Sequence, residues 1–190
     1  MQLDTLPVLE GRSVTLRQAQ TDDAEARFRL GNPPEILEML GVSRDAVRPP
    51  TLESAAKWVQ DLIDHPRAWV IETDRLIGDV RLDRIDMQDK RASLAIGILD
   101  QECLGKGLGT EVIMLVLGHA FRDLKLHRIS IRVLSYNARA LRCYQKCGFL
   151  IEGRERETAF INGQWYDDFI MGLLEHEFKP PLRLSESSSS

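Results

Sequence analysis

The sequence has few cysteines and no surplus of basic residues. Its 190 residues include three cysteines, which do not make the disulfide framework of a small secreted domain. Neither these cysteines nor the four scattered histidines form the closely spaced ligand sets that metal ions require. A formal net charge of −4 argues against the basic surface of a nucleic-acid-binding protein. We therefore predict a protein with no metal site and no nucleic-acid partner.

Long apolar runs are also missing. The longest stretch, Val112 to Leu117, is far shorter than the roughly 20 residues that a membrane-spanning helix needs. The N-terminal residues MQLDTLPVLEGRSV contain no basic start followed by an apolar run, so we expect no secretory signal. The sequence therefore predicts a soluble, cytoplasmic protein that does not bind a membrane.

What is present fits one ordinary globular domain. Hydrophobic residues make up 43% and charged residues 28% of the chain, and the length suits one well-filled core. No internal repeat and no Gly/Ser-rich linker divides the sequence. Low complexity is confined to the C-terminus, which ends in four serines and cannot bury enough apolar surface to fold. We expect a domain over residues 1–178 and a disordered tail over residues 179–190.

Apolar periodicity and turn residues predict an α/β fold: a mixed, mostly antiparallel sheet with helices on both faces. Capping residues mark helix starts at Thr21 and Thr51, and Gly148 marks a helix end. The first predicted helix begins near residue 21 and ends near residues 31–33, and the second surrounds residues 36–40. Three further helices are predicted over residues 51–63, 107–124 and 138–147. The predicted strands cover residues 13–18, 68–72, 76–85, 92–99, 128–133, 149–158 and 165–173.

The strongest local signal is the segment LGKGLGTE at residues 104–111, between a predicted strand and a long predicted helix. Glycines allow tight turns and close backbone approach, and free N–H groups at a helix N-terminus can hold phosphate. The spacing fits neither the Gly-Lys-Ser/Thr P-loop nor the Gly-x-Gly-x-x-Gly dinucleotide fingerprint. A glycine-rich turn without a ligand is the alternative for this segment taken alone.

A second segment, YNARALRCYQKCGF at residues 136–149, follows the first by about 30 residues. Together the two segments resemble the central signatures of the GCN5-related N-acetyltransferase (GNAT) superfamily, in its branch of ribosomal-protein N-terminal and spermidine acetyltransferases. The resemblance covers about residues 10–175. It includes Leu16-Arg17, Asp22-Asp23, Ala95 to Ile98, Phe121, Leu126 to Arg128, Glu152-Gly153 and Asn162 to Asp167.

The resemblance implies acetyl-CoA as cosubstrate and a splayed pair of parallel strands at the centre of the sheet. The strand ending at Ile98-Leu99 would part from the one at residues 128–133, and the pantetheine arm would enter the gap. The family's phosphate-binding motif maps onto residues 104–109, with Leu104 in place of the usual basic or amide side chain. The implied coenzyme-binding residues are Ile98, Leu99, Leu104, Gly105, Lys106, Gly107, Leu108, Gly109, Thr110, Asn137 and Lys146.

By the same resemblance, Tyr144 is the residue that protonates the departing thiolate. A phenol suits this role because its ordinary pKa, about 10, lies above the value of about 8.5 for a thiol. The general base is left unassigned, since many relatives carry a glutamate where this chain has Ala95. Carboxylates on neighbouring strands are candidates: Glu72, and Asp79 and Asp83, which alternation puts on one face if no bulge intervenes. A water chain that ends on a carboxylate or a backbone carbonyl is an equal alternative.

The partner that the resemblance implies is an amine: a polyamine, an aminoglycoside or an amino acid, with a protein N-terminus as the alternative. A non-catalytic acyl-CoA-binding module is an alternative from another class, and a homodimer is compatible with each. Residues 29–50 and 161–166 are expected to shape the acceptor site. Within them, Glu35 and Glu38 could attract a polyamine, and Trp165 and Tyr166 could line the pocket.

Overall fold

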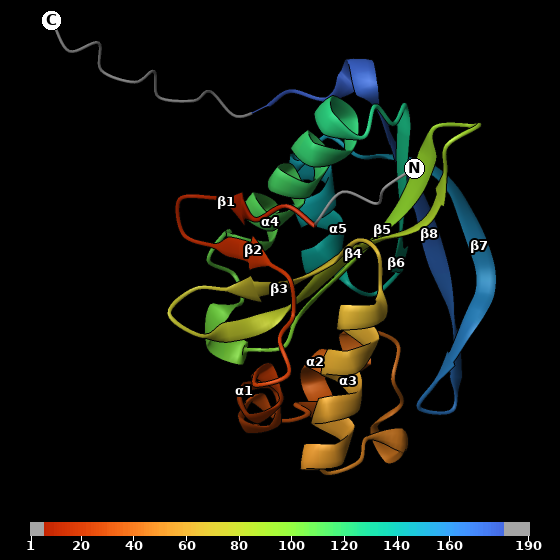
Figure 1. The fold of residues 1–190 in the computed structure, drawn as a ribbon. Helices are drawn as coiled ribbons and strands as arrows, with labels where there is room; N and C mark the ends of the chain where they lie inside the picture. The colour runs from red at the N-terminus through yellow and green to blue at the C-terminus, as the bar shows by residue number, and fades with distance from the viewer. Residues whose placement is uncertain (1–5, 181–190) are drawn as a thin grey trace, which may run out of the picture.

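A sheet of eight strands forms the centre of the fold (Figure 1). A computed structural model describes residues 6–180 of the chain. The strand order is β1-β2-β3-β4-β5-β6-β8-β7. The strands are β1 (Leu9–Glu10), β2 (Thr15–Arg17), β3 (Ala68–Glu72), β4 (Leu76–Asp86), β5 (Arg91–Ile98), β6 (Arg128–Leu134), β7 (Leu150–Ile161) and β8 (Gln164–Leu174).

Strand pairing confirms the predicted mixed sheet. Within residues 6–180, neighbouring strands pair antiparallel except β5 and β6, which are parallel. The predicted meander of β3, β4 and β5 is present. Strands β7 and β8 form a hairpin whose two-residue turn, Asn162-Gly163, has positive φ at both positions, as a tight hairpin turn requires.

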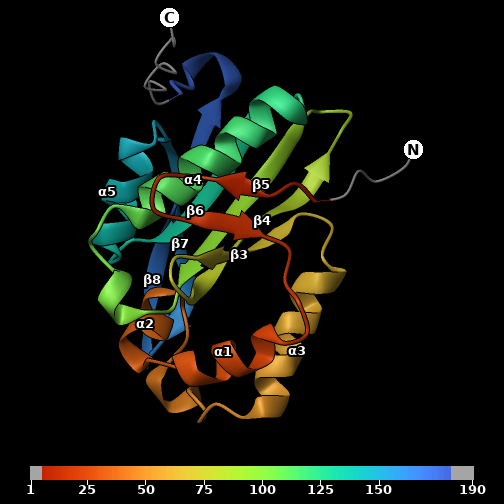
Figure 2. The ribbon, with the colours of Figure 1, turned by 60° about the vertical axis from the view of Figure 1, so that its left-hand side comes forward.

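Helices cover both faces of the sheet, as predicted (Figures 1 and 2). The helices are α1 (Asp23–Leu30), α2 (Pro34–Met39), α3 (Leu52–Asp64), α4 (Leu108–Gly118) and α5 (Ala138–Lys146). Alternate side chains of β3 pack on opposite faces of the sheet: Trp69 and Ile71 pack with α4 and α5, whereas Ala68 and Val70 pack with α1 and α3. Short 3-10 turns cover Arg44–Ala46, Gln101–Cys103 and Glu175–Glu177.

Two predicted caps have different outcomes. Thr51 caps α3 as predicted, with its Oγ1 accepting from the Ser54 amide at 3.0 Å and the Ser54 hydroxyl accepting in return. The predicted cap at Thr21 is wrong: the N-cap of α1 is Asp22, whose side chain makes no capping bond. Instead, the buried carboxylate of Asp23, the first residue of α1, accepts from the Gln20 amide at 2.7 Å and so stabilises this turn.

Other differences concern the ends of elements. The helix predicted over residues 107–124 is regular only to Gly118 and continues as a π-helical turn, His119–Asp123. Strand β7 runs three residues past the predicted end, with a register shift between Glu155 and Ala159, and the short strand β1 was not predicted. The predicted tail beyond residue 180 lies outside the described residues. No helix of the described part is long and apolar enough to cross a membrane.

Candidate active site

The parallel strands β5 and β6 separate along their length. Their pairing covers only Arg91 to Ser93 on β5, against Arg128 to Ser130 on β6. Beyond that point β5 still pairs with β4 as far as Ile98, while β6 pairs with β8 along its whole length. One edge of β5, from residue 94 to 98, is therefore open on the side of β6. This is the predicted splayed pair, and its open edge can pair with an extended ligand that carries amides.

The glycine-rich segment turns directly into the first turn of α4. Gly105 and Gly107 have φ values of +74° and +81°, which favour glycine, and Gly107 is the N-cap of α4. A Cβ at either position would meet nothing within 4 Å. The amides of residues 107–110 donate no hydrogen bond to any group among residues 6–180. Four free N–H groups at a helix N-terminus form a concentrated site for an anion.

A cavity of about 300 Å³ connects the glycine-rich segment with the open edge of β5. Helix α2 closes it on one side and α5 on another. The lining residues are Ile36, Met39, Leu40, Ile96, Ile98, Cys103, Leu104, Gly105, Gly107, Leu108, Gly109, Thr110, Ile113, Asn137, Arg139, Ala140, Arg142, Cys143, Tyr144 and Lys146. Of the predicted coenzyme residues, Leu99 and Lys106 do not line it: Leu99 is buried and Lys106 is exposed.

Tyr144 lies on the cavity side of α5 and is 8% exposed. Its ring packs edge-on against Phe149 at 6.3 Å between ring centroids, and its hydroxyl makes no hydrogen bond to the described residues. Burial, and then the nearby thiols of Cys143 and Cys147, raise the pKa of this phenol above its ordinary value. The hydroxyl is therefore protonated at neutral pH and free to donate a proton into the cavity.

Asn137 is the N-cap of α5. Its Oδ1 accepts from the Ala140 amide at 3.1 Å, and its Nδ2 donates to the Met39 carbonyl at 3.1 Å. The same side chain thus starts α5 and holds the end of α2 against it. Because both α2 and α5 line the cavity, Asn137 fixes the distance between two of its walls.

Positive charge surrounds the glycine-rich end of the cavity. Arg139, Arg142 and Lys146 all line it from α5, and none of them forms an ion pair within the described part of the chain. The positive end of the α4 dipole adds to this field. Of the three, Lys146 was predicted from the sequence, whereas both arginines were missed. Arg139, Arg142 and Lys146 lie three and four residues apart, so they share one face of α5. This spacing is the signal that would have identified the two arginines.

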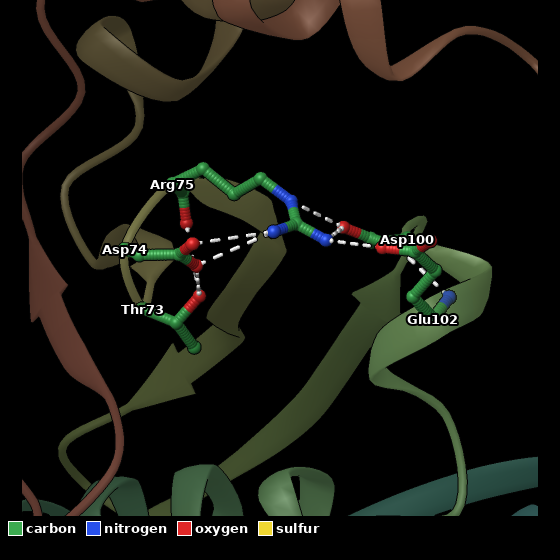
Figure 3. Close-up of polar contacts among 5 residues, drawn as sticks. All are labelled: Thr73, Asp74, Arg75, Asp100 and Glu102. Carbon is green, nitrogen blue, oxygen red and sulfur yellow. Dashed lines mark hydrogen bonds and ion pairs between the residues drawn. The ribbon is translucent and has the colours of Figure 1, made fainter.

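A second group of charges holds the segment that leads into the glycine-rich turn (Figure 3). Arg75, in the turn between β3 and β4, binds the buried Asp100 at 2.8 Å and Glu102 at 2.9 Å. Asp100 also accepts from the Glu102 amide at 2.9 Å and so caps the short turn before Leu104. Sequence reasoning missed this anchor, because Arg75 and Asp100 lie 25 positions apart.

The segment around α2 is held down from two sides. The Tyr136 hydroxyl donates to the Glu38 carbonyl at 2.6 Å. From the β7–β8 turn, Asn162 donates to the Glu38 carboxylate at 3.1 Å and accepts from the Arg44 amide at 2.8 Å. The two segments expected to shape the acceptor site, residues 29–50 and 161–166, therefore do meet. Trp165 does not line the cavity: it is 58% exposed and packs on Phe160.

A second cavity of about 310 Å³ lies beside the first, between α2 and the start of α5. It shares Ile36, Met39, Leu104, Asn137 and Arg139 with the first cavity. Glu35 contributes a carboxylate to its wall, which the sequence singled out as a possible amine ligand. No group of three or more potential metal ligands is found among residues 6–180.

Comparisons with known proteins agree on one family. The acetyltransferase (GNAT) domain family matches residues 13–150. The chain is 30% identical to a probable N-acetyltransferase, YjcK, of Bacillus subtilis, over 88% of this chain and 97% of that protein. It is 34% identical to spermidine N(1)-acetyltransferase of Escherichia coli over 59% of this chain and 60% of that enzyme.

A solved structure has a fold similar to that of this chain. The structure of spermidine N-acetyltransferase from Vibrio cholerae, in complex with CoA and spermine, aligns with a TM-score of 0.74 and 28% identity. The alignment covers 88% of this chain and 98% of that one.

Proposed function

This chain belongs to the acetyltransferase (GNAT) family, and from this premise we propose that it acetylates the primary amine of a small molecule by direct attack in a ternary complex. Acetyl-CoA as donor and acyl transfer as reaction follow from family membership. One observation carries the finer proposal. Residues 107–110 with their free amides, Ile96 and Ile98 of the open β5 edge, and Tyr144 with its free hydroxyl all line one cavity.

The coenzyme would lie along this cavity. The diphosphate would lie on the amides of residues 107–110, in the space that Gly107 leaves open, with Arg142 and Lys146 at its rim. The pantetheine amides would pair with the open edge of β5 near Ile96 and Ile98. This arrangement would bring the thioester to the splay, between α2 and α5.

Tyr144 would then act on the leaving group. As the amine nitrogen bonds to the carbonyl carbon, the C–S bond breaks and the phenol gives its proton to the thiolate sulfur. The raised pKa of Tyr144 keeps that proton in place until the thiolate develops. Most of the remaining rate enhancement would come from holding amine and thioester in line within the cavity.

The contacts that hold α2 over the site favour a small acceptor over a long peptide. Asn162 and Tyr136 fasten α2 across the site, which would limit the room for a peptide on that side. The second cavity, with Glu35 as well as Arg139 in its wall, would offer room for a compact cation beside the first cavity. The relatives include spermidine acetyltransferases, which supports an amine of this size.

The proposal is tested by measuring free thiol released from acetyl-CoA in the presence of candidate acceptors. The panel contains polyamines, aminoglycosides, amino acids and peptides with free N-termini, each with its fully N-acetylated form as control. We expect release with at least one small amine and none with its blocked form. Release with N-terminal peptides alone would support the alternative acceptor, and coenzyme binding without release for any amine would contradict the proposal.

Cys143 offers a test of where the coenzyme binds. Its Sγ lies 3.4 Å from the Thr110 hydroxyl, in the cavity wall, and the thiol of Cys147 lowers the pKa of Cys143. Burial raises the pKa of Cys103 instead. Because the thiolate is the reactive form, iodoacetamide should modify Cys143 faster than Cys103 at pH 7.

Saturating CoA should slow the modification of Cys143 at least tenfold. Peptide mass spectrometry measures both rates, and Cys143→Ser identifies the labelled peptide. A rate at Cys143 that does not change with CoA would place the coenzyme elsewhere.

A further inference from the structure

The most buried carboxylate beside the splay is Asp79 on β4. It is 7% exposed and lies opposite Gly97, in the stretch of β5 that β6 leaves unpaired. Its Oδ2 accepts from the Arg81 guanidinium at 3.2 Å, whereas its Oδ1 makes no hydrogen bond to any group in residues 6–180. One carboxylate oxygen is therefore held in place and the other is free.

The free oxygen lies near Leu40, a residue of the cavity wall, although neither Asp79 nor Gly97 lines the cavity itself. An ideal Cβ at Gly97 would lie 3.7 Å from Asp79 Oδ1 and 3.6 Å from a methyl carbon of Leu40, which lines the cavity. Because Gly97 has no side chain, nothing from that residue fills the space between the carboxylate and the cavity wall. Any other residue at this position would insert a side chain between them.

The charges around Asp79 come from two elements, α1 and β4. Arg27 of α1 and Arg81 of β4 favour its ionised form, while Asp83 of β4 opposes it. Arg81 also pairs with Asp83, at 3.1 Å, so Asp79 and Asp83 lie on one face of the sheet. Asp83 pairs in addition with His65, which follows α3, at 3.0 Å. Burial outweighs both arginines and raises the pKa of Asp79 to about 6. Asp79 is thus largely ionised at neutral pH, yet is a better proton acceptor than an exposed aspartate.

We propose that Asp79 accepts the proton that the amine must lose before it attacks the thioester, an assignment that rests on the proposed function. An ammonium ion has no lone pair, so one of its protons passes to Asp79 Oδ1 across the space at Gly97. The freed lone pair forms the N–C bond, the C–S bond breaks, and Tyr144 protonates the sulfur. A second nitrogen proton restores the Tyr144 phenol, and Asp79 returns its proton to solvent.

The experiment compares wild type with Asp79→Asn from pH 5 to 9.5, measuring kcat/KM for the best amine at saturating acetyl-CoA. Wild-type kcat/KM should fall below a pH of about 6, because Asp79 then becomes protonated. Asp79→Asn can use only amine that is already neutral, so its kcat/KM should rise with pH up to the amine pKa of about 10. The variant should be at least tenfold slower at pH 7, and the deficit should shrink as pH rises.

Asp83→Asn is the matched control, because it removes the other carboxylate that Arg81 binds on the same face. We expect it to keep the level kcat/KM of wild type above pH 6, with the acid decline moved to lower pH, because the Asp83 charge that opposes ionisation of Asp79 is gone. Asp79→Glu, which retains a carboxyl group, should keep the decline at acid pH and provides a second test if the asparagine variant does not fold.

If kcat/KM of Asp79→Asn is lowered by the same factor at every pH, Asp79 has a structural role and the proposal is overturned. A pH profile of Asp79→Asn equal to that of wild type would also overturn it. The acetyl-CoA-induced rise in melting temperature is measured on each variant. A wild-type enzyme that binds acetyl-CoA but acetylates no amine would instead refute the proposed function.

Discussion

Gly107→Glu is expected to abolish acetyl-CoA binding. The new side chain would enter the space in front of the free amides of residues 107–110, with a negative charge where the diphosphate would lie. For the wild type, acetyl-CoA at about 100 times its Kd should stabilise the fold by about 2.7 kcal/mol, a rise of about 5–10 °C in Tm. The variant should show no rise, and thermal unfolding with and without acetyl-CoA measures this.

A residue other than glycine at positive φ destabilises the fold by about 1–2 kcal/mol. The control variant must therefore replace a glycine with a similar φ value. Gly163→Glu is this control: φ is +79° at Gly163 and +81° at Gly107, and neither would-be Cβ meets an atom within 4 Å. Gly163 lies in the β7–β8 turn and does not line the cavity. Gly107→Asn separates strain from charge and should bind acetyl-CoA more weakly than wild type. If folded Gly107→Glu responds to acetyl-CoA as Gly163→Glu does, the diphosphate does not bind at this turn.

The parts of the fold that local signals specify could be predicted from the sequence. Alternating apolar residues identified the strands of the sheet, and Thr51 with Gly148 marked helix ends where the structure has them. The glycine-rich segment was also placed correctly, since its conformation depends on its own residues. At Thr21 the local signal was misleading, because the buried Asp23, fixed by Arg17 and the Gln20 amide, binds that turn instead.

The parts of the site that were missed depend on residues far apart in the chain. Arg75 reaches Asp100, and Asn162 reaches Glu38 and Arg44, through pairings that only the assembled sheet brings about. Asp79 is a similar case. Alternation put it on one face with Asp83, but the space at Gly97 depends on the register of β4 against β5.

Tyr144→Phe is expected to lower kcat by a factor of about 10²–10⁴, the usual contribution of a general acid or base. The substitution removes one hydroxyl and keeps the ring that packs against Phe149. Since that hydroxyl makes no hydrogen bond within residues 6–180, its loss leaves no protein group unpaired and should change Tm little. Affinity for acetyl-CoA should also change little, because the amides of residues 107–110 would carry the phosphate contacts.

Tyr166→Phe is the matched control, since it also removes a phenol hydroxyl but from β8, where that hydroxyl donates to Gln164 at 2.8 Å and does not line the cavity. Its kcat should stay within about twofold of wild type. The two variants are compared by single-turnover acetyl transfer, so that product release does not hide the chemical step. A leaving group more acidic than the CoA thiol needs less help from an acid, so the deficit of Tyr144→Phe should shrink with such a thioester. A deficit that does not depend on the leaving group, or a rate within about threefold of wild type, would remove Tyr144 from the reaction.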